Sequence, residues 1–250
     1  MTIPERLTYE STDERWLIRI TDDGSPTLVD QISGDAMHSG CGAWAETEHV
    51  YLRNSGLHDR LTRGIASRVL EVGLGSGLGC LMTMQFAEDA KTPVQYVALE
   101  QKLAPPALIR QLQFERHGID HELIDAYCSV LSSQPVEGKI IGDVGAFGDL
   151  TICLGDAVLW TGAGYQPFDA IYFDPYSPES NAELWGLPVL SVMRQVLAPG
   201  GRLVSYCVSR LVRDHLAQAG FEVERVAGPV GGKREVLIAS ARSSAAPPAE

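Results

Sequence analysis

The sequence predicts an α/β protein whose main unit is a mostly parallel sheet covered by helices. From residue 68 onward, short runs rich in β-branched and aromatic residues alternate with helical patterns, which is typical of such a sheet. A glycine-rich turn separates the first of these runs from the first helical pattern. Two β runs at the end of the chain, joined by a Gly-Pro turn, predict an antiparallel hairpin. The chain is therefore expected to form a doubly wound sheet with a terminal antiparallel hairpin.

The expected elements of this unit follow one another along the chain. We expect strands at 68–73, 94–100, 150–154, 168–174 and 201–207, and helices at 77–89, 104–117, 183–197 and 209–219. The hairpin is expected to pair residues 221–226 with residues 234–240. The segment 120–148 mixes a short helical pattern with glycine-rich sequence, and we interpret it as an insertion near the active face.

The two ends of the chain differ in character from the main unit. Residues 1–60 contain two β runs joined across Asp-Asp-Gly-Ser-Pro, which predicts a small N-terminal β extension. Residues 61–242 would then form the main domain. Residues 243–250 are small and proline-rich, so we expect a disordered tail.

Composition narrows the class of protein. The 250 residues contain no apolar stretch approaching the roughly 18 residues of a membrane span, and the first residues lack a signal-peptide pattern. The five cysteines are scattered and form no metal-binding motif. We therefore expect a cytoplasmic protein without a membrane or metal partner. The net charge of −12 argues against binding nucleic acid by global attraction. Residues 190–240 nevertheless hold seven basic and four acidic side chains, which would allow a local basic face.

The glycine-rich turn has the pattern E-x-G-x-G-x-G, formed by Glu71, Gly73, Gly75 and Gly77. Glycine at these positions permits a sharp turn and a close approach of backbone N–H groups to a ligand. The spacing does not fit the dinucleotide fingerprint, the phosphate-binding P-loop or the hydrolase elbow. The remaining pattern is the one seen in S-adenosyl-L-methionine (SAM) methyltransferases, so we expect all four residues to border SAM. The alternative is a glycine-rich turn that binds no ligand.

Two acidic residues follow later strands of the predicted sheet. Glu100 ends the second strand, where its carboxylate can accept hydrogen bonds from both hydroxyls of a ribose. Asp156 follows the strand at 150–154, where it can accept from the exocyclic amine of adenine. The alternatives are a solvated strand-end acid at Glu100 and a turn cap at Asp156.

Asp174 is the best candidate for catalysis and is also expected to border the cofactor. The apolar strand at 168–174 delivers its carboxylate to the sheet edge, and Pro175 stiffens the loop that follows. Methyl transfer requires a neutral nucleophile held about 3 Å from the methyl group, but an amine is mostly protonated at neutral pH. Asp174 would orient the amine and help it lose a proton, while Tyr176 would stack on a ring. The alternative is a loop acid that caps the next helix.

Several segments together resemble one family. They are 38–52, 69–78, 174–185, 212–221 and 233–237. In this order they are similar to the methyltransferase domain of MnmC, which finishes 5-methylaminomethyl-2-thiouridine at the wobble position of tRNA. The resemblance implies a SAM-dependent N-methyltransferase that converts 5-aminomethyl-2-thiouridine in tRNA.

The resemblance also assigns roles to particular residues. Glu46 would border the cofactor, and Arg213, Lys233 and Arg234 would contact RNA or shape the site. Arg210 joins these three as a candidate for the basic face. The alternative for Arg213, Lys233 and Arg234 is ordinary surface charge. Two other interpretations remain open. One is a methyltransferase of the same fold that acts on a small-molecule amine, and the other is a non-catalytic relative of the fold.

Overall fold

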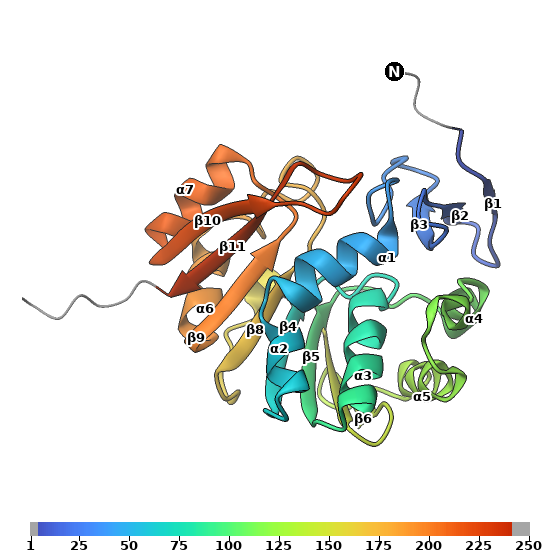
Figure 1. Cartoon of the computed structure of the whole chain (residues 1–250), viewed down its shortest axis with the longest axis horizontal. Helices are drawn as coiled ribbons and strands as arrows, with labels where there is room; N and C mark the ends of the chain where they lie inside the picture. Colours follow the sequence, from blue (N-terminus) through green and yellow to red (C-terminus); the bar gives the residue numbers. More distant parts are fainter. Residues whose placement is uncertain (1–4, 242–250) are drawn as a thin grey trace, which may run out of the picture.

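The computed structural model describes residues 5–241, so the expected tail at 243–250 lies outside the described residues. Its centre is an eight-stranded sheet in the order β10-β11-β9-β8-β4-β5-β7-β6 (Figure 1). The strands are β4 (Ser67–Val72), β5 (Val94–Glu100), β6 (Lys139–Asp143), β7 (Gly148–Leu154), β8 (Phe168–Phe173), β9 (Leu197–Ser205), β10 (Phe221–Ala227) and β11 (Glu235–Ala241). The strands from β9 to β7 in this order are parallel, whereas β6, β10 and β11 run antiparallel to their neighbours. The predicted α/β fold with its terminal hairpin is confirmed.

Helices cover both faces of the sheet. Successive residues of a strand point to opposite faces, so neighbouring residues of one strand pack beneath different helices. Val69 packs in a core beneath the helices between residues 43 and 131, and the next residue, Leu70, packs in a second core beneath α6 and α7. The helices are α1 (Ala43–Glu46), α2 (Leu57–Thr62), α3 (Leu78–Ala90), α4 (Pro106–Gln111), α5 (His121–Leu131), α6 (Leu187–Val196) and α7 (Arg210–Gln218), with a π-helix η1 (Thr47–Arg53) and short 3₁₀ turns η2 (Phe114–His117) and η3 (Ala157–Leu159). The expected helix at 104–117 is therefore divided, and Gln113, with φ of 50°, marks the break.

The N-terminal region is only partly β-structured. A small antiparallel sheet contains β1 (Thr8–Glu10), β2 (Trp16–Ile20) and β3 (Pro26–Asp30). Residues 43–62 are helical instead, and apolar side chains of these helices, such as Val50 and Leu57, are fully buried in the core of the main sheet. The β extension is thus shorter than residues 1–60, and its C-terminal part belongs to the helical layer.

The interpretation of 120–148 as an insertion near the active face is wrong. Helix α5 packs Leu123, Tyr127 and Val130 into the core, and β6 pairs with β7 as an edge strand of the main sheet. The glycines that suggested a loop instead permit close packing, since a Cβ at Gly142 would lie 2.7 Å from the Val130 side chain. This segment therefore belongs to the main α/β unit, as one of its helices and one of its edge strands.

Neither a membrane span nor a metal cluster is found in the described part of the chain. Within residues 5–241, every helix is too short or too polar to cross a membrane. In the same residues, His, Cys, Asp and Glu side chains do not gather in groups that could hold a metal ion.

Candidate active site

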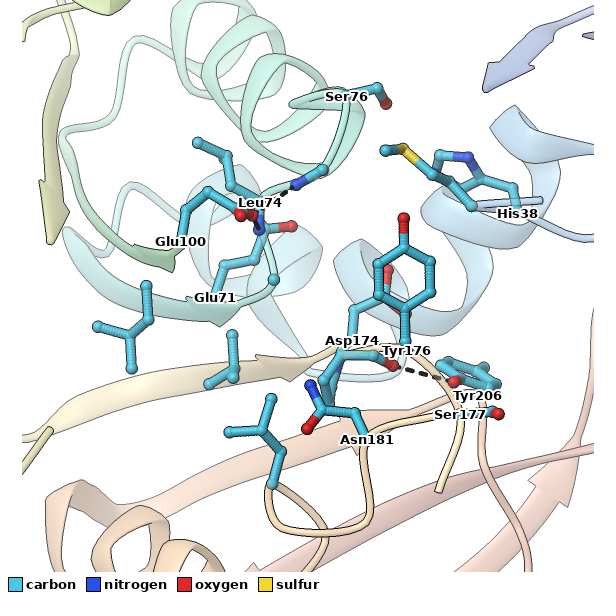
Figure 2. Close-up of a pocket in the computed structure, with 18 of the residues that line it drawn as sticks. His38, Glu71, Leu74, Ser76, Glu100, Asp174, Tyr176, Ser177, Asn181 and Tyr206 are labelled. Atoms are coloured by element: carbon cyan, nitrogen blue, oxygen red, sulfur yellow. Dashed lines mark hydrogen bonds between the residues drawn. The ribbon is translucent and has the colours of Figure 1, made fainter. Parts of the chain in front are cut away.

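A cavity of about 400 Å³ lies at the carboxyl edge of the parallel strands, where β4 and β8 are neighbours (Figure 2). From β4 the chain passes through α3 to β5 on one side, whereas β8 lies on the other side, so the strand order reverses here. Ligands of open α/β sheets bind at such reversals, and cofactor pockets have volumes of about 300–1,000 Å³. The N-terminal segment 35–39 and the start of η1 complete the lining.

Two walls of this cavity differ in composition, and we name them by their residues. The glycine-loop wall consists of Gly73, Leu74, Gly75, Glu100 and Asp156. The acidic wall consists of Glu46, Thr47, Tyr51, Asp174, Tyr206 and Lys233. In Figure 2, Leu74 and Glu100 lie on one side of the cavity, and Asp174 and Tyr206 lie on the other.

Glycine is required in the loop after β4. Gly73 has φ of 91°, and a Cβ at this position would lie 2.7 Å from the backbone oxygen of Asp174. Gly75 has φ of 55° and faces the Met37 sulfur. Gly77 is not part of the cavity lining, and a Cβ there would collide with the Tyr127 hydroxyl, so its contact with SAM stays a prediction. Gly77 allows the start of α3 to approach α5.

Glu100 connects the glycine loop to the end of β5. Its Oε2 accepts hydrogen bonds from the backbone N–H groups of Leu74, at 3.0 Å, and Gly75, at 3.2 Å. Its Oε1 accepts from the N–H groups of Gln101 and Lys102 at 2.8 and 2.9 Å. A carboxylate has about four lone-pair sites, so these bonds fill it. A ribose contact at Glu100 would therefore have to share or replace one of them.

Asp156 lines the cavity from the loop after β7. Its Oδ1 accepts a hydrogen bond of 2.9 Å from the Val158 N–H and so caps the 3₁₀ turn η3. Oδ1 of Asp156 therefore has the turn-capping role that the sequence left as the alternative. The side chain is exposed, and a contact between its other oxygen and adenine stays a prediction.

Glu71 lies at the inner end of the cavity with 4 % of its surface exposed. Its Oε2 has no hydrogen-bond partner within the described residues. Burial raises the pKa of the Glu71 carboxyl well above its usual range, which favours the neutral acid. The hydrogen-bonding group beside this carboxyl is the Tyr96 hydroxyl, which is also buried without a partner of normal geometry among the described residues.

Asp174 follows β8 directly, and its N–H donates a hydrogen bond of 3.0 Å to the carbonyl of Val72. The carboxyl is partly exposed to the cavity, but the surrounding protein removes most of its water. The pKa of Asp174 is raised to about 8, mainly by this desolvation, with a smaller rise from the neighbouring Glu46 and opposing contributions from Tyr51 and Lys233. The side chain can thus change between acid and base near neutral pH.

The loop after Asp174 is held by two side chains. The Tyr206 hydroxyl donates to the Pro175 carbonyl at 2.9 Å (Figure 2). The Trp185 indole N–H donates to the Tyr176 carbonyl at 2.8 Å. Burial also raises the pKa of Tyr176 to about 12, so its hydroxyl stays protonated. Tyr176 lines the cavity with 39 % of its surface exposed, which leaves its ring accessible for stacking.

The other acidic-wall residues come from distant parts of the chain. Glu46 is 6 % exposed, its Oε2 accepts a 2.9 Å hydrogen bond from the Ser39 N–H, and burial raises its pKa. Lys233 places its Nζ 3.8 Å from the centre of the Tyr206 ring, a cation–π distance. Thr47 and Tyr51 carry buried hydroxyls without hydrogen-bond partners among the described residues. Thr47, Tyr51 and Tyr206 carry no sequence pattern that predicts a site.

Lys233 is the one of the four basic candidates that reaches the cavity. Arg213 donates to the Val208 carbonyl at 3.1 Å and borders a separate surface groove with Arg225. Arg210 and Arg234 are exposed away from the cavity lining. A contact between these three arginines and RNA stays a prediction.

Comparison with known proteins agrees with this geometry. Residues 136–242 match the S-adenosyl-L-methionine-dependent methyltransferase family. The bifunctional tRNA 5-methylaminomethyl-2-thiouridine biosynthesis protein MnmC of Delftia acidovorans is 30 % identical over 216 residues, which cover 82 % of this chain and 32 % of that protein. The MnmC of Paracidovorax citrulli is 31 % identical over 204 residues, which cover 78 % and 31 %. The chain therefore spans about a third of the length of these relatives.

A solved structure is similar over almost the whole chain. The crystal structure of MnmC2 from Aquifex aeolicus matches with a TM-score of 0.70 and 27 % identity, covering 96 % of this chain and 74 % of that one. The fold, the cavity and the family match together define a SAM-dependent methyltransferase. Within this class, the chain is a methyltransferase domain like that of MnmC.

The residues of the cavity fit SAM. Gly73 and Gly75 leave the backbone free to approach a ligand, Glu100 holds the N–H groups of this loop in place, and Asp156 presents a free carboxylate oxygen after β7. The unpaired Oε2 of Glu71 offers a further hydrogen-bonding atom at the inner end. These features suit SAM, a polar nucleoside that has no pyrophosphate group.

Proposed function

We propose that this chain methylates the amine of 5-aminomethyl-2-thiouridine at the wobble position of tRNA and produces 5-methylaminomethyl-2-thiouridine. The observation that carries the proposal is the position of Asp174, a desolvated carboxyl at the strand reversal beside the cofactor cavity. The names of the MnmC relatives support the tRNA substrate. This activity agrees with the cytoplasmic location expected from the sequence.

Desolvation makes Asp174 a suitable base for an amine. In water, an aliphatic ammonium has a pKa near 10 and an aspartic acid near 4, so proton transfer between them is unfavourable by roughly 8 kcal/mol. With the pKa of Asp174 at about 8, the difference falls to about 2 units, or roughly 3 kcal/mol. Asp174 can therefore hold the ammonium as an ion pair and accept one of its protons.

Other residues position the reactants. When bound, SAM supplies a methyl group on a positively charged sulfur. Gly73, Gly75, Glu100 and Asp156 would hold this cofactor, and Tyr176 would stack on the base that carries the amine. Glu46 and Lys233 would balance the charge around Asp174. The catalytic unit would then include residues 61–242 together with the helical segment that contains Glu46.

A small-molecule amine is the second candidate substrate. The net charge of −12 and the position of three of the four basic candidates away from the cavity favour it. The chemistry at Asp174 would be the same for either acceptor.

One assay distinguishes the two substrates. The purified protein is incubated with methyl-labelled SAM and tRNA that carries 5-aminomethyl-2-thiouridine, with the same tRNA already methylated as the control. The proposal predicts label in the first tRNA and none in the second. It also predicts that tRNA binding weakens with salt, with a slope of roughly 0.7–0.9 per phosphate contact on logarithmic axes. Absence of both methylation and salt-dependent binding would remove tRNA as the substrate.

A further inference from the structure

Tyr51 occupies the acidic wall, and its buried hydroxyl makes no hydrogen bond of normal geometry among the described residues. Only 3 % of the residue surface is exposed. Burial raises the pKa of Tyr51 well above its usual value, so the hydroxyl keeps its proton at any physiological pH. It is therefore a permanent hydrogen-bond donor, and the acceptor within its reach is the Asp174 carboxyl.

The packing of Tyr51 explains where this donor lies. Its ring contacts the ring of Tyr172, with centroids 5.4 Å apart. Tyr172 and Asp174 are two residues apart in an extended segment, so their side chains leave the same face of the sheet. Tyr51 and Asp174 both line the cavity, and the Tyr51 hydroxyl is near enough to lower the pKa of Asp174. This donor thus lies beside the candidate base.

The backbone that carries Tyr51 is unusual. Residues Thr47–Arg53 form a π-helix directly after α1, and π-helical turns occur frequently at functional sites. The Thr47 hydroxyl in the same turn is also buried and unpaired. Two unpaired hydroxyls on one short segment that faces the cavity indicate that this segment is arranged for the site as well as for packing.

We propose that Tyr51 is a positioning residue whose hydroxyl donates a hydrogen bond to the ionised carboxylate of Asp174 and aims its free oxygen at the amine of the acceptor. Catalytic hydrogen bonds are often long or poorly aligned in a free enzyme and tighten when the substrate binds, which accounts for the present geometry. The inference rests on the proposed role of Asp174 as the base. It does not depend on whether the amine belongs to tRNA or to a small molecule.

The other charged and titratable groups around Asp174 do not replace this donor. They are Glu46 on α1, Glu71 on β4, Tyr206 after β9 and Lys233 before β11. The two glutamates disfavour the Asp174 carboxylate, and the Tyr206 hydroxyl already donates to Pro175. Lys233 favours the carboxylate through its charge, with its Nζ over the Tyr206 ring. Tyr51 is therefore the hydroxyl placed to orient the carboxyl.

The test follows the titration of Asp174 directly. The protein is labelled with ¹³Cγ-aspartate, the Asp174 signal is assigned by its loss in Asp174→Asn, and its chemical shift is measured against pH. Tyr51→Phe removes only the hydroxyl, so the ionised form loses a donor and the midpoint should rise by about one pH unit. The matched control is Tyr172→Phe, because this buried hydroxyl contacts Thr83 at 3.2 Å and does not line the cavity. The control should leave the Asp174 midpoint unchanged.

Activity gives a second measurement. In Tyr51→Phe, the pH at which kcat reaches its plateau should move upward with the midpoint, while SAM affinity stays at the wild-type value. An unchanged midpoint in Tyr51→Phe, or an equal shift in Tyr172→Phe, would overturn the inference. Because the titration needs no acceptor, a shifted midpoint in a protein that does not methylate tRNA would support the role of Tyr51 and reject only the proposed substrate.

Discussion

The two walls of the cavity differ in how far the chain satisfies its own polar groups. On the glycine-loop wall, Glu100 accepts four backbone hydrogen bonds and Asp156 caps a turn. On the acidic wall, Thr47 and Tyr51 have unpaired buried hydroxyls, and burial raises the pKa of Asp174. On the first wall, one oxygen of Asp156 stays free and the Glu100 carboxylate is fully bonded, whereas the second wall retains buried hydroxyls without hydrogen bonds of normal geometry.

This difference indicates that one wall recognises the cofactor and the other moves a proton. A wall with satisfied hydrogen bonds keeps a fixed shape and suits recognition of a cofactor whose structure never varies. A wall with desolvated and unpaired groups carries a cost in stability, and such costs are concentrated at sites where a proton is moved. Substitutions on the two walls should therefore change different quantities.

The largest effect is expected for Asp174→Asn. This change keeps the size of the side chain but removes the base, so kcat should fall by roughly 10²–10⁴-fold. Calorimetry should show wild-type SAM affinity, because the glycine-loop wall is intact. Asp149→Asn, an exposed acid on β7, serves as the control and should keep normal turnover. Near-normal turnover in Asp174→Asn would make Asp174 a structural loop residue.

The same variant should change stability in a pH-dependent way. The pKa of Asp174 is about 8 in the folded protein and near 3.9 in the unfolded chain, so the folded state binds the proton more tightly. Wild-type stability should consequently fall as pH rises from about 4 to 8, since the slope follows the difference in bound protons. Asp174→Asn cannot ionise, so its free energy of unfolding should exceed that of the wild type by a few kcal/mol at pH 8. Chemical denaturation at pH 5 and 8 measures this, and an advantage that does not grow with pH would contradict the desolvation of Asp174.

Glu100→Ala should produce an intermediate effect on the other wall. It removes the acceptor that holds the Leu74 and Gly75 N–H groups, and SAM binding should weaken by roughly 1.5–3 kcal/mol. The kcat at saturating SAM should change little, because Asp174 is untouched. Gln95→Ala, an exposed residue of the same strand, is the control. Equal SAM affinities for Glu100→Ala and this control would place cofactor recognition elsewhere.

The smallest effect is expected for Lys233→Met. Lys233 favours the Asp174 carboxylate through its charge, but it is exposed, and exposed charges interact by only about 0.2–1 kcal/mol. Turnover at neutral pH should fall less than about fivefold, with the loss recovered at higher pH. Arg234→Met changes the neighbouring charge away from the cavity lining and should keep the wild-type pH dependence. A matching response in the two variants would show that Lys233 acts only through surface charge.

The two walls also differ in how well the sequence predicts them. The glycine-loop wall follows from local patterns, since Gly73, Gly75 and Glu100 stand at strand ends whose position the alternation of strands and helices determines. Gly77 shows the limit of such patterns, because its requirement comes from the distant Tyr127 on α5. The acidic wall brings together residues from α1, η1, the loops after β8 and β9, and the terminal hairpin. A buried tyrosine such as Tyr51 resembles any core residue until the packing against Tyr172 is known.

The central claim is that a desolvated Asp174 accepts the proton of the amine, and the pH dependence of kcat/KM tests it most directly. Methyl transfer to the aminomethyl tRNA is measured from pH 6 to 10 for the wild type and Asp174→Asn. The wild type should rise with pH and reach a plateau near pH 8, where Asp174 ionises. The slower variant should instead continue to rise towards the amine pKa of about 10, because only the free amine can then react. If both proteins rise together to about pH 10, Asp174 does not act as the base.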